Sequence, residues 1–240
     1  MNNLQLFFSA EEIKKEIPSV EQHLHSNFSD GENSPEELIN YALEKRIWRI
    51  AFTEHVRRDS DWYKDFIEVI RDLKEKYKTK IEILTGLEAK VINFKGEIDA
   101  TDDQLNKAEI RIGSVHSYCK RGEDGQFCQI EDLSEKEALE TELECALALI
   151  KNAKNSKINV VGHPFGVYLA AYLKSIPVNY WERIIREIAL NNLAFDLNYR
   201  YHQDSFEIVL NLCDKFGVKI NIGSDAHNLA DVGCARKFKI

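Results

Sequence analysis

The chain has 240 residues, of which 44% are hydrophobic, and contains only four Pro and eleven Gly. This length and composition suit one domain with one sizeable core and leave little material for long disordered linkers. The formal net charge of -8 disfavours a surface for extended nucleic acid, because such a surface needs clustered Lys and Arg to contact phosphates. We therefore expect a single domain over residues 1–240 that has no extended nucleic-acid partner.

The five cysteines are an odd number without a close Cys-x-x-Cys pair, so the sequence predicts neither a disulfide framework nor a zinc knuckle. The apolar run from Leu4 to Phe8 has no basic flank and is too short for a signal peptide. No apolar segment approaches the length that spans a bilayer. We expect a cytoplasmic protein without a membrane partner, and the oligomeric state stays open.

Short apolar runs alternate with longer amphipathic stretches, which is the pattern of βα units. Strands are expected at 19–23, 48–53, 81–87, 109–115, 158–162, 193–197 and 218–222. Helices are expected from 34 onward and at 60–77, 133–153, 178–190 and 204–216. Ser34, Pro35 and Glu37 form a capping-box sequence at the start of the first of these helices. Seven strands with intervening helices predict an α/β fold, either a closed or nearly closed barrel or an open doubly wound sheet.

Six of the seven histidines lie at or just after the C-terminal end of an expected strand. They are His23, His25, His55, His116, His163 and His227. Four acidic residues occupy the same kind of position, namely Asp30, Glu54, Glu88 and Asp225. In a β/α barrel these strand ends converge on one mouth, so the side chains would lie close together.

Taken singly, each of these residues also fits an ordinary structural role. A lone histidine can be a hydrogen-bonded rim or core residue, Glu88 a solvated loop acid and Asp225 a helix cap. Alternation along a strand nevertheless places His23 and His25 on one face, as two ligands of one metal require. The joint placement indicates a nitrogen and oxygen ligand set that suits Zn, Mn or Fe.

The motifs occur in a fixed order: His23-Leu24-His25-Ser26 with Ser29-Asp30-Gly31, Thr53-Glu54-His55, Gly86-Leu87-Glu88, Ser114-Val115-His116, Gly162-His163-Pro164 and Gly223-Ser224-Asp225-Ala226-His227. In this order, from about residue 20 to 228, the chain resembles the PHP (polymerase and histidinol phosphatase) domain family. The stretches 86–90 and 96–99 are similar to the stand-alone histidinol-phosphatase-like members. The resemblance implies a distorted seven-stranded (β/α)7 barrel with two or three divalent metal ions at the C-terminal ends of its strands.

Carried over position by position, the resemblance assigns three metal sites. The first contains His23, His25, Glu88 and Asp225, the second contains Glu88 as a bridge with His116 and His163, and the third contains Asp30, His55 and His227. A carboxylate that holds two cations a few Å apart lets a bridging water lose its proton near neutral pH, which supplies a hydroxide nucleophile. We assign catalytic roles to Glu88, Asp225, His227 and Arg200 in such a reaction.

A phosphate substrate also needs a positive side chain near the metals, and five cations follow expected strands. They are Arg57, Arg58, Lys120, Arg121 and Arg200. We favour Arg200 and then Arg57, because a guanidinium binds phosphate in a bidentate manner, although each could be a solvated loop charge. His202 and Tyr199 share the loop of Arg200 and could contact the substrate or protonate the leaving alkoxide; otherwise they are rim residues. Glu54 could orient a ligand ring through a hydrogen bond.

The leading functional hypothesis is hydrolysis of a small-molecule phosphate monoester, and histidinol phosphate, an intermediate of histidine biosynthesis, is the named substrate that the resemblance favours. A nucleotide or oligonucleotide phosphoesterase is one alternative, which the acidic charge disfavours. A non-catalytic metal-binding structural module is another. The complete set of ligand residues favours catalysis over such a module.

Overall fold

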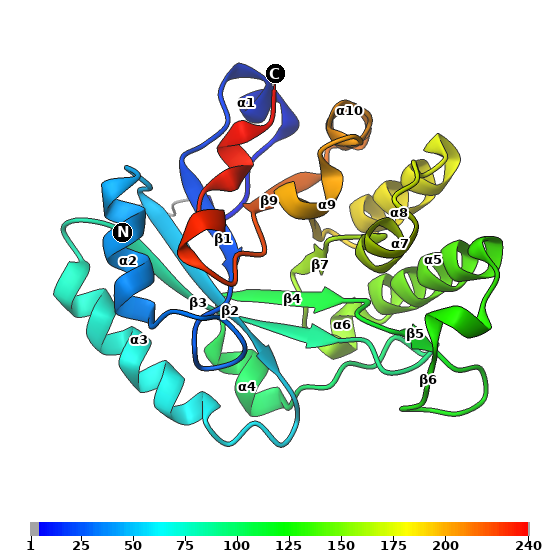
Figure 1. Cartoon of the computed structure of the whole chain (residues 1–240), viewed down its shortest axis with the longest axis horizontal. Helices are drawn as coiled ribbons and strands as arrows, with labels where there is room; N and C mark the ends of the chain where they lie inside the picture. Colours follow the sequence, from blue (N-terminus) through cyan, green and yellow to red (C-terminus); the bar gives the residue numbers. More distant parts are fainter. Residues whose placement is uncertain (1–4, 240) are drawn as a thin grey trace.

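The computed structural model describes residues 5–239 and contains one sheet of seven parallel strands in the order β1-β2-β3-β4-β7-β8-β9. These strands are β1 (Val20–Leu24), β2 (Arg49–Val56), β3 (Glu82–Lys90), β4 (Ile110–Ser114), β7 (Val160–Gly162), β8 (Ala194–Asn198) and β9 (Lys219–Gly223). The ends of the sheet meet where the His25 N–H donates to the Ala226 carbonyl and the Asp225 N–H donates to the His23 carbonyl, both at 2.9 Å. The chain is therefore an α/β barrel that is nearly closed between β9 and β1 (Figure 1), as predicted.

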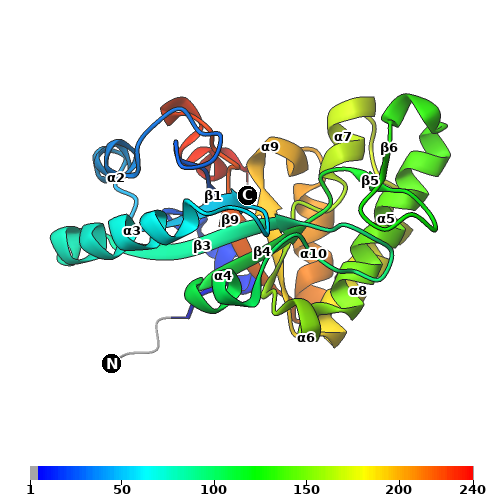
Figure 2. The ribbon, with the colours of Figure 1, turned by 90° about the horizontal axis from the view of Figure 1, so that it is seen from below.

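Helices follow most strands and lie outside the sheet; Figure 2 shows α3 and α5 on opposite sides of the strands. The predicted helices are present as α2 (Pro35–Glu44), α3 (Tyr63–Tyr77), α5 (Glu135–Lys151), α8 (Val178–Leu190) and α10 (Phe206–Phe216). The capping box at the start of α2 is formed, with the Ser34 N–H donating to Glu37 Oε2 at 2.8 Å. All seven predicted strands also occur, with boundaries that differ by a few residues.

Several short elements were not predicted. They are α1 (Ala10–Lys15), α4 (Asp102–Lys107), α6 (Ala153–Ser156), α7 (Gly166–Tyr172), α9 (Tyr199–His202), the 3-10 turns η1 (Ile130–Asp132), η2 (Leu229–Asp231) and η3 (Cys234–Lys237), and a hairpin of β5 (Tyr118–Cys119) and β6 (Phe127–Cys128). Most of them span too few residues to show a clear hydrophobic period. No helix within residues 5–239 has the length and apolar character that a bilayer crossing requires.

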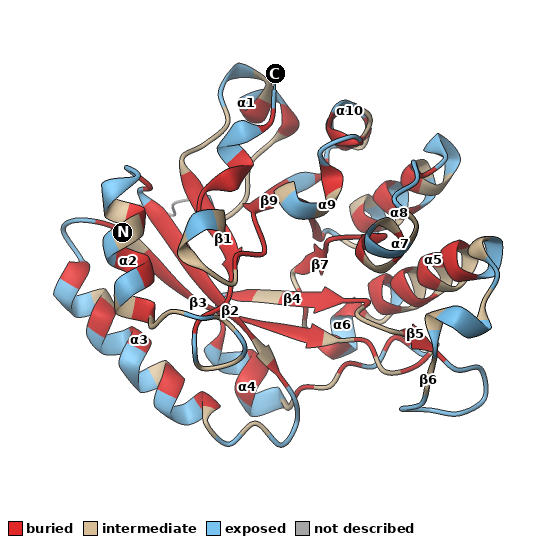
Figure 3. Ribbon diagram, in the orientation of Figure 1, coloured by how far each residue is buried: buried red, intermediate tan, exposed pale blue. Residues whose placement is uncertain are grey.

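The buried residues form a layer between the helices and the strands, and the helices turn their exposed faces outward (Figure 3). A second, smaller cluster of buried residues comes from the opposite side of the strands, and it consists of Ala51, Leu84, Ile110, Ile112, Val160 and Ala194. Leu6 and Phe7 pack against this cluster. Because side chains alternate along a strand, these residues face the inside of the barrel and fill its amino-terminal end.

The same inward-facing rows become polar toward the C-terminal ends of the strands. In β2 the row continues from Ala51 to Thr53 and His55, and in β3 it continues from Leu84 to Glu88. The apolar cluster therefore fills one end of the barrel, and the polar side chains lie at the mouth at the other end. This arrangement places the residues of the candidate site.

Candidate metal centre

Glu88 lies near the end of β3, and only 1% of its surface is exposed. Its Oε1 atom is 3.1 Å from His116 Nε2 and 3.0 Å from His163 Nε2, and it also accepts a hydrogen bond from the Ser114 hydroxyl. Its Oε2 atom faces the opposite set of rings, at 3.1 Å from His55 Nδ1 and 3.3 Å from His23 Nε2. The two oxygens of one buried carboxylate thus face two different sets of imidazoles.

A first group consists of His23, His25, Glu88 and Asp225, whose candidate ligand atoms all lie within 4.8 Å of one another. All four residues are buried. Asp225 Oδ1 is 3.1 Å from His25 Nε2 and 3.7 Å from His23 Nε2. This group matches the first predicted site.

The second predicted site contains Glu88, His116 and His163, and the structure brings these three side chains together. A group with all ligand atoms within 4.8 Å of one another also forms from His55, Glu88 and His116. His55 therefore lies between the predicted second and third sites. The second and third sites therefore adjoin each other at His55.

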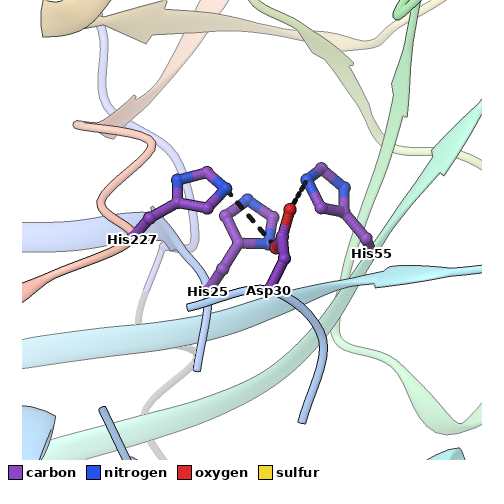
Figure 4. Close-up of side chains that lie close together, drawn as sticks. All are labelled: His25, Asp30, His55 and His227. Carbon is purple, nitrogen blue, oxygen red and sulfur yellow. Dashed lines mark ion pairs between the residues drawn. The ribbon is translucent and has the colours of Figure 1, made fainter. Parts of the chain in front are cut away.

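The third group is the most open of the three and contains His25, Asp30, His55 and His227 (Figure 4). Asp30 Oδ1 is 3.4 Å from His227 Nε2, and Asp30 Oδ2 is 3.6 Å from His55 Nε2. The Asp30 side chain is 55% exposed, in contrast to the buried residues of the first group. The three residues of the predicted third site thus lie together at the solvent side of the cluster, and His25 lies with them.

The residues present fit divalent metal ions. His23 Nε2 and Glu88 Oε2 are buried, face each other and have no hydrogen-bond partner within residues 5–239. A buried polar atom without a partner is costly, and a cation between these two atoms would satisfy both. Imidazole nitrogens and carboxylate oxygens without cysteine are ligands for Zn, Mn or Fe.

The pKa shifts of three residues suit this use, whereas nearby carboxylates, against the effect of burial, raise the pKa of four other imidazoles, whose protons a cation would displace: His23, His55, His163 and His227. Burial would raise the pKa of the Glu88 and Asp225 carboxyls, but the neighbouring imidazoles lower both pKa values below their ordinary range. Burial, helped by the positive charge of His55, lowers the pKa of His25 to about 3. At neutral pH both acids are therefore carboxylates and His25 is a neutral imidazole, which are the forms that bind metal.

Two glycines allow the strands that carry this centre to approach closely. A Cβ atom on Gly223 would lie 2.3 Å from the Cβ of His23, and one on Gly162 would lie 1.8 Å from the Ser114 hydroxyl oxygen. Both distances are shorter than any real contact of a Cβ atom with a neighbouring side chain. The glycines that precede Asp225 and His163 in their motifs are therefore required by the packing of neighbouring strands.

Buried acids support the loops that carry the candidate ligands. Glu54 accepts hydrogen bonds from the Ser26 N–H at 3.0 Å and from the hydroxyls of Ser26 and Ser29, so it shapes the loop that carries Asp30. The sequence allowed Glu54 either to orient a ligand ring or to be a rim residue, and its hydrogen bonds go to this loop. Glu21 accepts from the Ser224 and Gly233 N–H groups, both at 2.9 Å, and fixes the loop that carries Asp225.

A cavity of about 790 Å³ opens above the centre. Two of the five predicted phosphate-binding cations, Arg57 and Arg200, line it together with Lys90. Arg200 Nη1 lies 3.5 Å from Asp225 Oδ2. The other three predicted cations do not line the cavity. Arg58 donates to the Ile98 carbonyl at 3.2 Å, Lys120 pairs with Glu123 at 2.8 Å, and Arg121 pairs with Glu144.

The structure corrects the substrate-binding role expected of His202. His202 is fully buried, where its Nδ1 accepts from the Asn198 N–H and its Nε2 donates to the Pro164 carbonyl, both at 3.1 Å. Its ring packs against Trp181 and Phe195. It is therefore a core residue that holds two loops together.

Tyr201, which the sequence did not single out, lines the cavity in its place. Its hydroxyl donates to Asp225 Oδ2 at 3.2 Å, and its ring centre lies 4.9 Å from that of His163. Burial and the negative charge of Asp225 raise the pKa of the Tyr201 hydroxyl, so it stays protonated at neutral pH. Tyr199 lies against Phe238 and is absent from the lining of this cavity.

Comparison with known proteins agrees with this geometry. A "Probable phosphatase" from Caldicellulosiruptor bescii is 30% identical over 220 residues, which cover 89% of this chain and 82% of that protein. The histidinol phosphate phosphatase of Lactococcus lactis, crystallised with zinc, L-histidinol and phosphate, superimposes with a TM-score of 0.74 at 25% identity. That superposition covers 91% of this chain and 89% of the other.

The hisK protein of Listeria monocytogenes has the same fold, with a TM-score of 0.67 at 16% identity over 89% of this chain and 97% of that one. The sequence profile of the PHP domain matches residues 21–200, a range that contains the first ligand motif and ends at Arg200. The profile match, the ordered motifs and the barrel with its histidine-rich mouth lead to one assignment: the chain belongs to the PHP domain family.

Proposed function

We propose that this chain is a metal-dependent phosphoesterase that hydrolyses a small-molecule phosphate monoester, with histidinol phosphate as the favoured named substrate. The observation that carries the proposal is the placement of Glu88, whose two buried oxygens face separate sets of imidazoles. A carboxylate in this position can bridge two cations, as two-metal hydrolysis of phosphate esters requires. The phosphatase names of the relatives support the same reaction class.

Two or three divalent cations are part of the proposal, held by the residues of the three predicted sites. When bound, they activate water for attack on phosphorus and neutralise charge on the phosphate. Zinc is the first choice, because the Lactococcus lactis enzyme was crystallised with it, and manganese or iron would suit the same donors. A cytoplasmic role in histidine biosynthesis would follow from histidinol phosphate as substrate.

Side chains that line the cavity would bind the phosphate and the leaving oxygen. Arg200, which is half exposed and adjacent to Asp225, is placed to hold a phosphate with its guanidinium, and Arg57 offers a second cation on the β2 side of the cavity. The protonated hydroxyl of Tyr201 offers a hydrogen bond to the phosphate or to the leaving oxygen. Asp225 and His227 line the same cavity and lie next to each other, with Asp225 Oδ1 3.9 Å from His227 Nδ1.

Phosphate release from a substrate panel tests the proposal. The panel contains histidinol phosphate, nucleoside monophosphates, sugar phosphates and a short oligonucleotide, each assayed with zinc, with manganese and with a chelator. We expect turnover of a small monoester that the chelator abolishes. Preferred cleavage of the nucleotides or the oligonucleotide would replace the substrate class, and no turnover despite tightly bound metal would favour a non-catalytic metal module.

A further inference from the structure

Asp196 lies in β8 at the position two residues after Ala194, on the row that faces the inside of the barrel. None of its surface is exposed. It is not among the predicted ligand residues, and no candidate metal group found within residues 5–239 contains it. A carboxylate without solvent is costly unless other groups pair with it, so its partners indicate its role.

Asp196 has three hydrogen-bond partners, which come from three different strands or strand ends. Its Oδ2 accepts from His23 Nδ1 at 2.8 Å and from the His163 N–H at 3.2 Å. Its Oδ1 accepts from Asn221 Nδ2 in β9 at 2.8 Å. Both partners of Oδ2 are candidate metal ligands, while Asn221 holds the carboxylate in its orientation.

The contact with His23 decides which ring nitrogen is free. Because Nδ1 donates to Asp196, one proton of the ring is held on Nδ1, and Nε2 is the nitrogen whose lone pair a cation would take. That Nε2 atom points at Glu88 Oε2 at 3.3 Å and has no hydrogen-bond partner within residues 5–239. The ring is thus held in the tautomer and orientation that a metal ligand needs.

The contact with His163 extends this control to the other side of Glu88. The His163 ring faces Glu88 Oε1, whereas the His23 ring faces Oε2, and the two rings stack with centres 5.6 Å apart. A single oxygen of Asp196 therefore holds the ring of His23 and the backbone of His163, one residue from each of the two sets that flank Glu88.

We propose that Asp196 is the positioning residue of the metal centre, which fixes the His23 tautomer and aligns His23 with His163 across Glu88. This inference rests on the proposed metal binding but not on the identity of the substrate. Its alternative is a purely structural role, in which any buried carboxylate of the core would have the same effect on the protein.

Asp196→Asn tests the inference, because asparagine has nearly the same shape and keeps an oxygen acceptor but lacks the charge. Glu142→Gln is the matched control. Glu142 is 1% exposed and accepts from the Tyr168 N–H at 2.8 Å and the Val167 N–H at 3.2 Å, with none of its hydrogen bonds reaching a candidate ligand. We expect zinc affinity to fall about 10- to 100-fold in Asp196→Asn, with an altered visible spectrum of the cobalt form, and to stay unchanged in Glu142→Gln.

Unchanged affinity and cobalt spectrum in Asp196→Asn would overturn the inference, and so would an equal loss in Glu142→Gln. Long-range proton–nitrogen NMR of the zinc-loaded wild-type chain gives a test that does not depend on the folding of a variant. His23 protonated at Nδ1 supports the inference, and His23 protonated at Nε2 overturns it. Zinc binding without phosphatase activity would remove only the proposed substrate, whereas a wild-type chain that binds no metal removes the inference as well.

Discussion

The hydroxyl of Tyr201 donates to Asp225 Oδ2 at 3.2 Å, while Asp225 Oδ1 faces His25 at 3.1 Å. One carboxylate therefore has an edge toward the candidate metal ligands and an edge toward the cavity. Arg200 lies against the same cavity edge, at 3.5 Å from Oδ2. At this edge a bound phosphate could accept hydrogen bonds from Tyr201 and Arg200.

Tyr201→Phe removes one hydroxyl and keeps the ring that packs against His163. We expect kcat/KM for the phosphate monoester to fall about 10- to 100-fold, because a hydrogen bond to a charged group is lost. Steady-state kinetics and zinc content measure the two quantities separately. Equal kcat/KM in the variant and the wild type would rule out the donor role, and lost zinc would show that Tyr201 acts by holding Asp225.

Glu88→Ala removes the carboxylate that both sets of imidazoles face, so we expect metal content to drop and phosphate release to fall to background. Elemental analysis and the phosphate assay check this together. Glu68→Ala, which changes an exposed acid on α3, is the control and should behave as the wild type. Full metal content with full turnover in Glu88→Ala would disprove the bridging role.

Arg200→Ala removes the guanidinium next to Asp225, and we expect KM and the inhibition constant of inorganic phosphate to rise together, about 10-fold or more. Arg57→Ala should have a smaller effect in the same direction. Arg121→Ala is the matched control, because Arg121 pairs with Glu144 and is absent from the lining of the cavity. Wild-type phosphate inhibition in Arg200→Ala would assign the phosphate to another cation.

His202→Ala should destabilise the fold by about 2 kcal/mol or more, because it leaves a cavity beside Trp181 and removes the partner of two buried backbone groups. KM of the folded enzyme should not change. Urea unfolding and steady-state kinetics test the two statements. Wild-type stability combined with a raised KM would restore the substrate-binding role that the sequence suggested.

Stability should depend on pH through Glu142. Burial raises the pKa of its carboxyl from 4.5 to about 7, despite hydrogen bonds from the Tyr168 and Val167 N–H groups that lower it. The folded state therefore holds this proton more tightly than the unfolded state. The resulting stability is fully present below about pH 4.5 and is lost as the pH rises through about 7.

Glu142→Gln cannot ionise and should lack this part of the pH dependence. Between pH 5 and 8 the free energy of unfolding of the wild type should fall relative to that of the variant, by up to about 3 kcal/mol. Denaturant unfolding of both metal-free proteins across this range measures the difference. A difference that does not vary with pH would show that the Glu142 carboxyl has the same pKa in the folded and unfolded states, so that burial does not raise it.

The succession of strands and main helices along the chain could be predicted because these segments are long enough to show a clear hydrophobic period. In α2 the capping box of Ser34 and Glu37 also marks the start of the helix. The hairpin of β5 and β6 could not, since its strands have two residues each and join through a turn that contains Gly122 and Gly125. The candidate ligands were identifiable because they lie at or just after the C-terminal ends of strands, where a barrel gathers side chains.

The residues that support the ligands were harder to identify. Asp196 and Glu21 lie inside strands, and only the charge of Asp196 between Phe195 and Leu197 could have marked one of them. Tyr201 and His202 are adjacent in α9, where a rotation of about 100° per residue sends one into the cavity and the other into the core. The sequence contains no signal for the phase of such a short helix.

His25 and Asp225 are 200 residues apart in the chain, yet their side chains lie 3.1 Å apart across the seam between β1 and the end of β9. In the proposed metal-bound protein, a cation shared by them would act as a cross-link between the first and the last strand of the barrel. The centre can assemble only after this long loop has closed, so binding energy becomes folding energy for the whole barrel. Metal occupancy would then report that the first and last strands have come together.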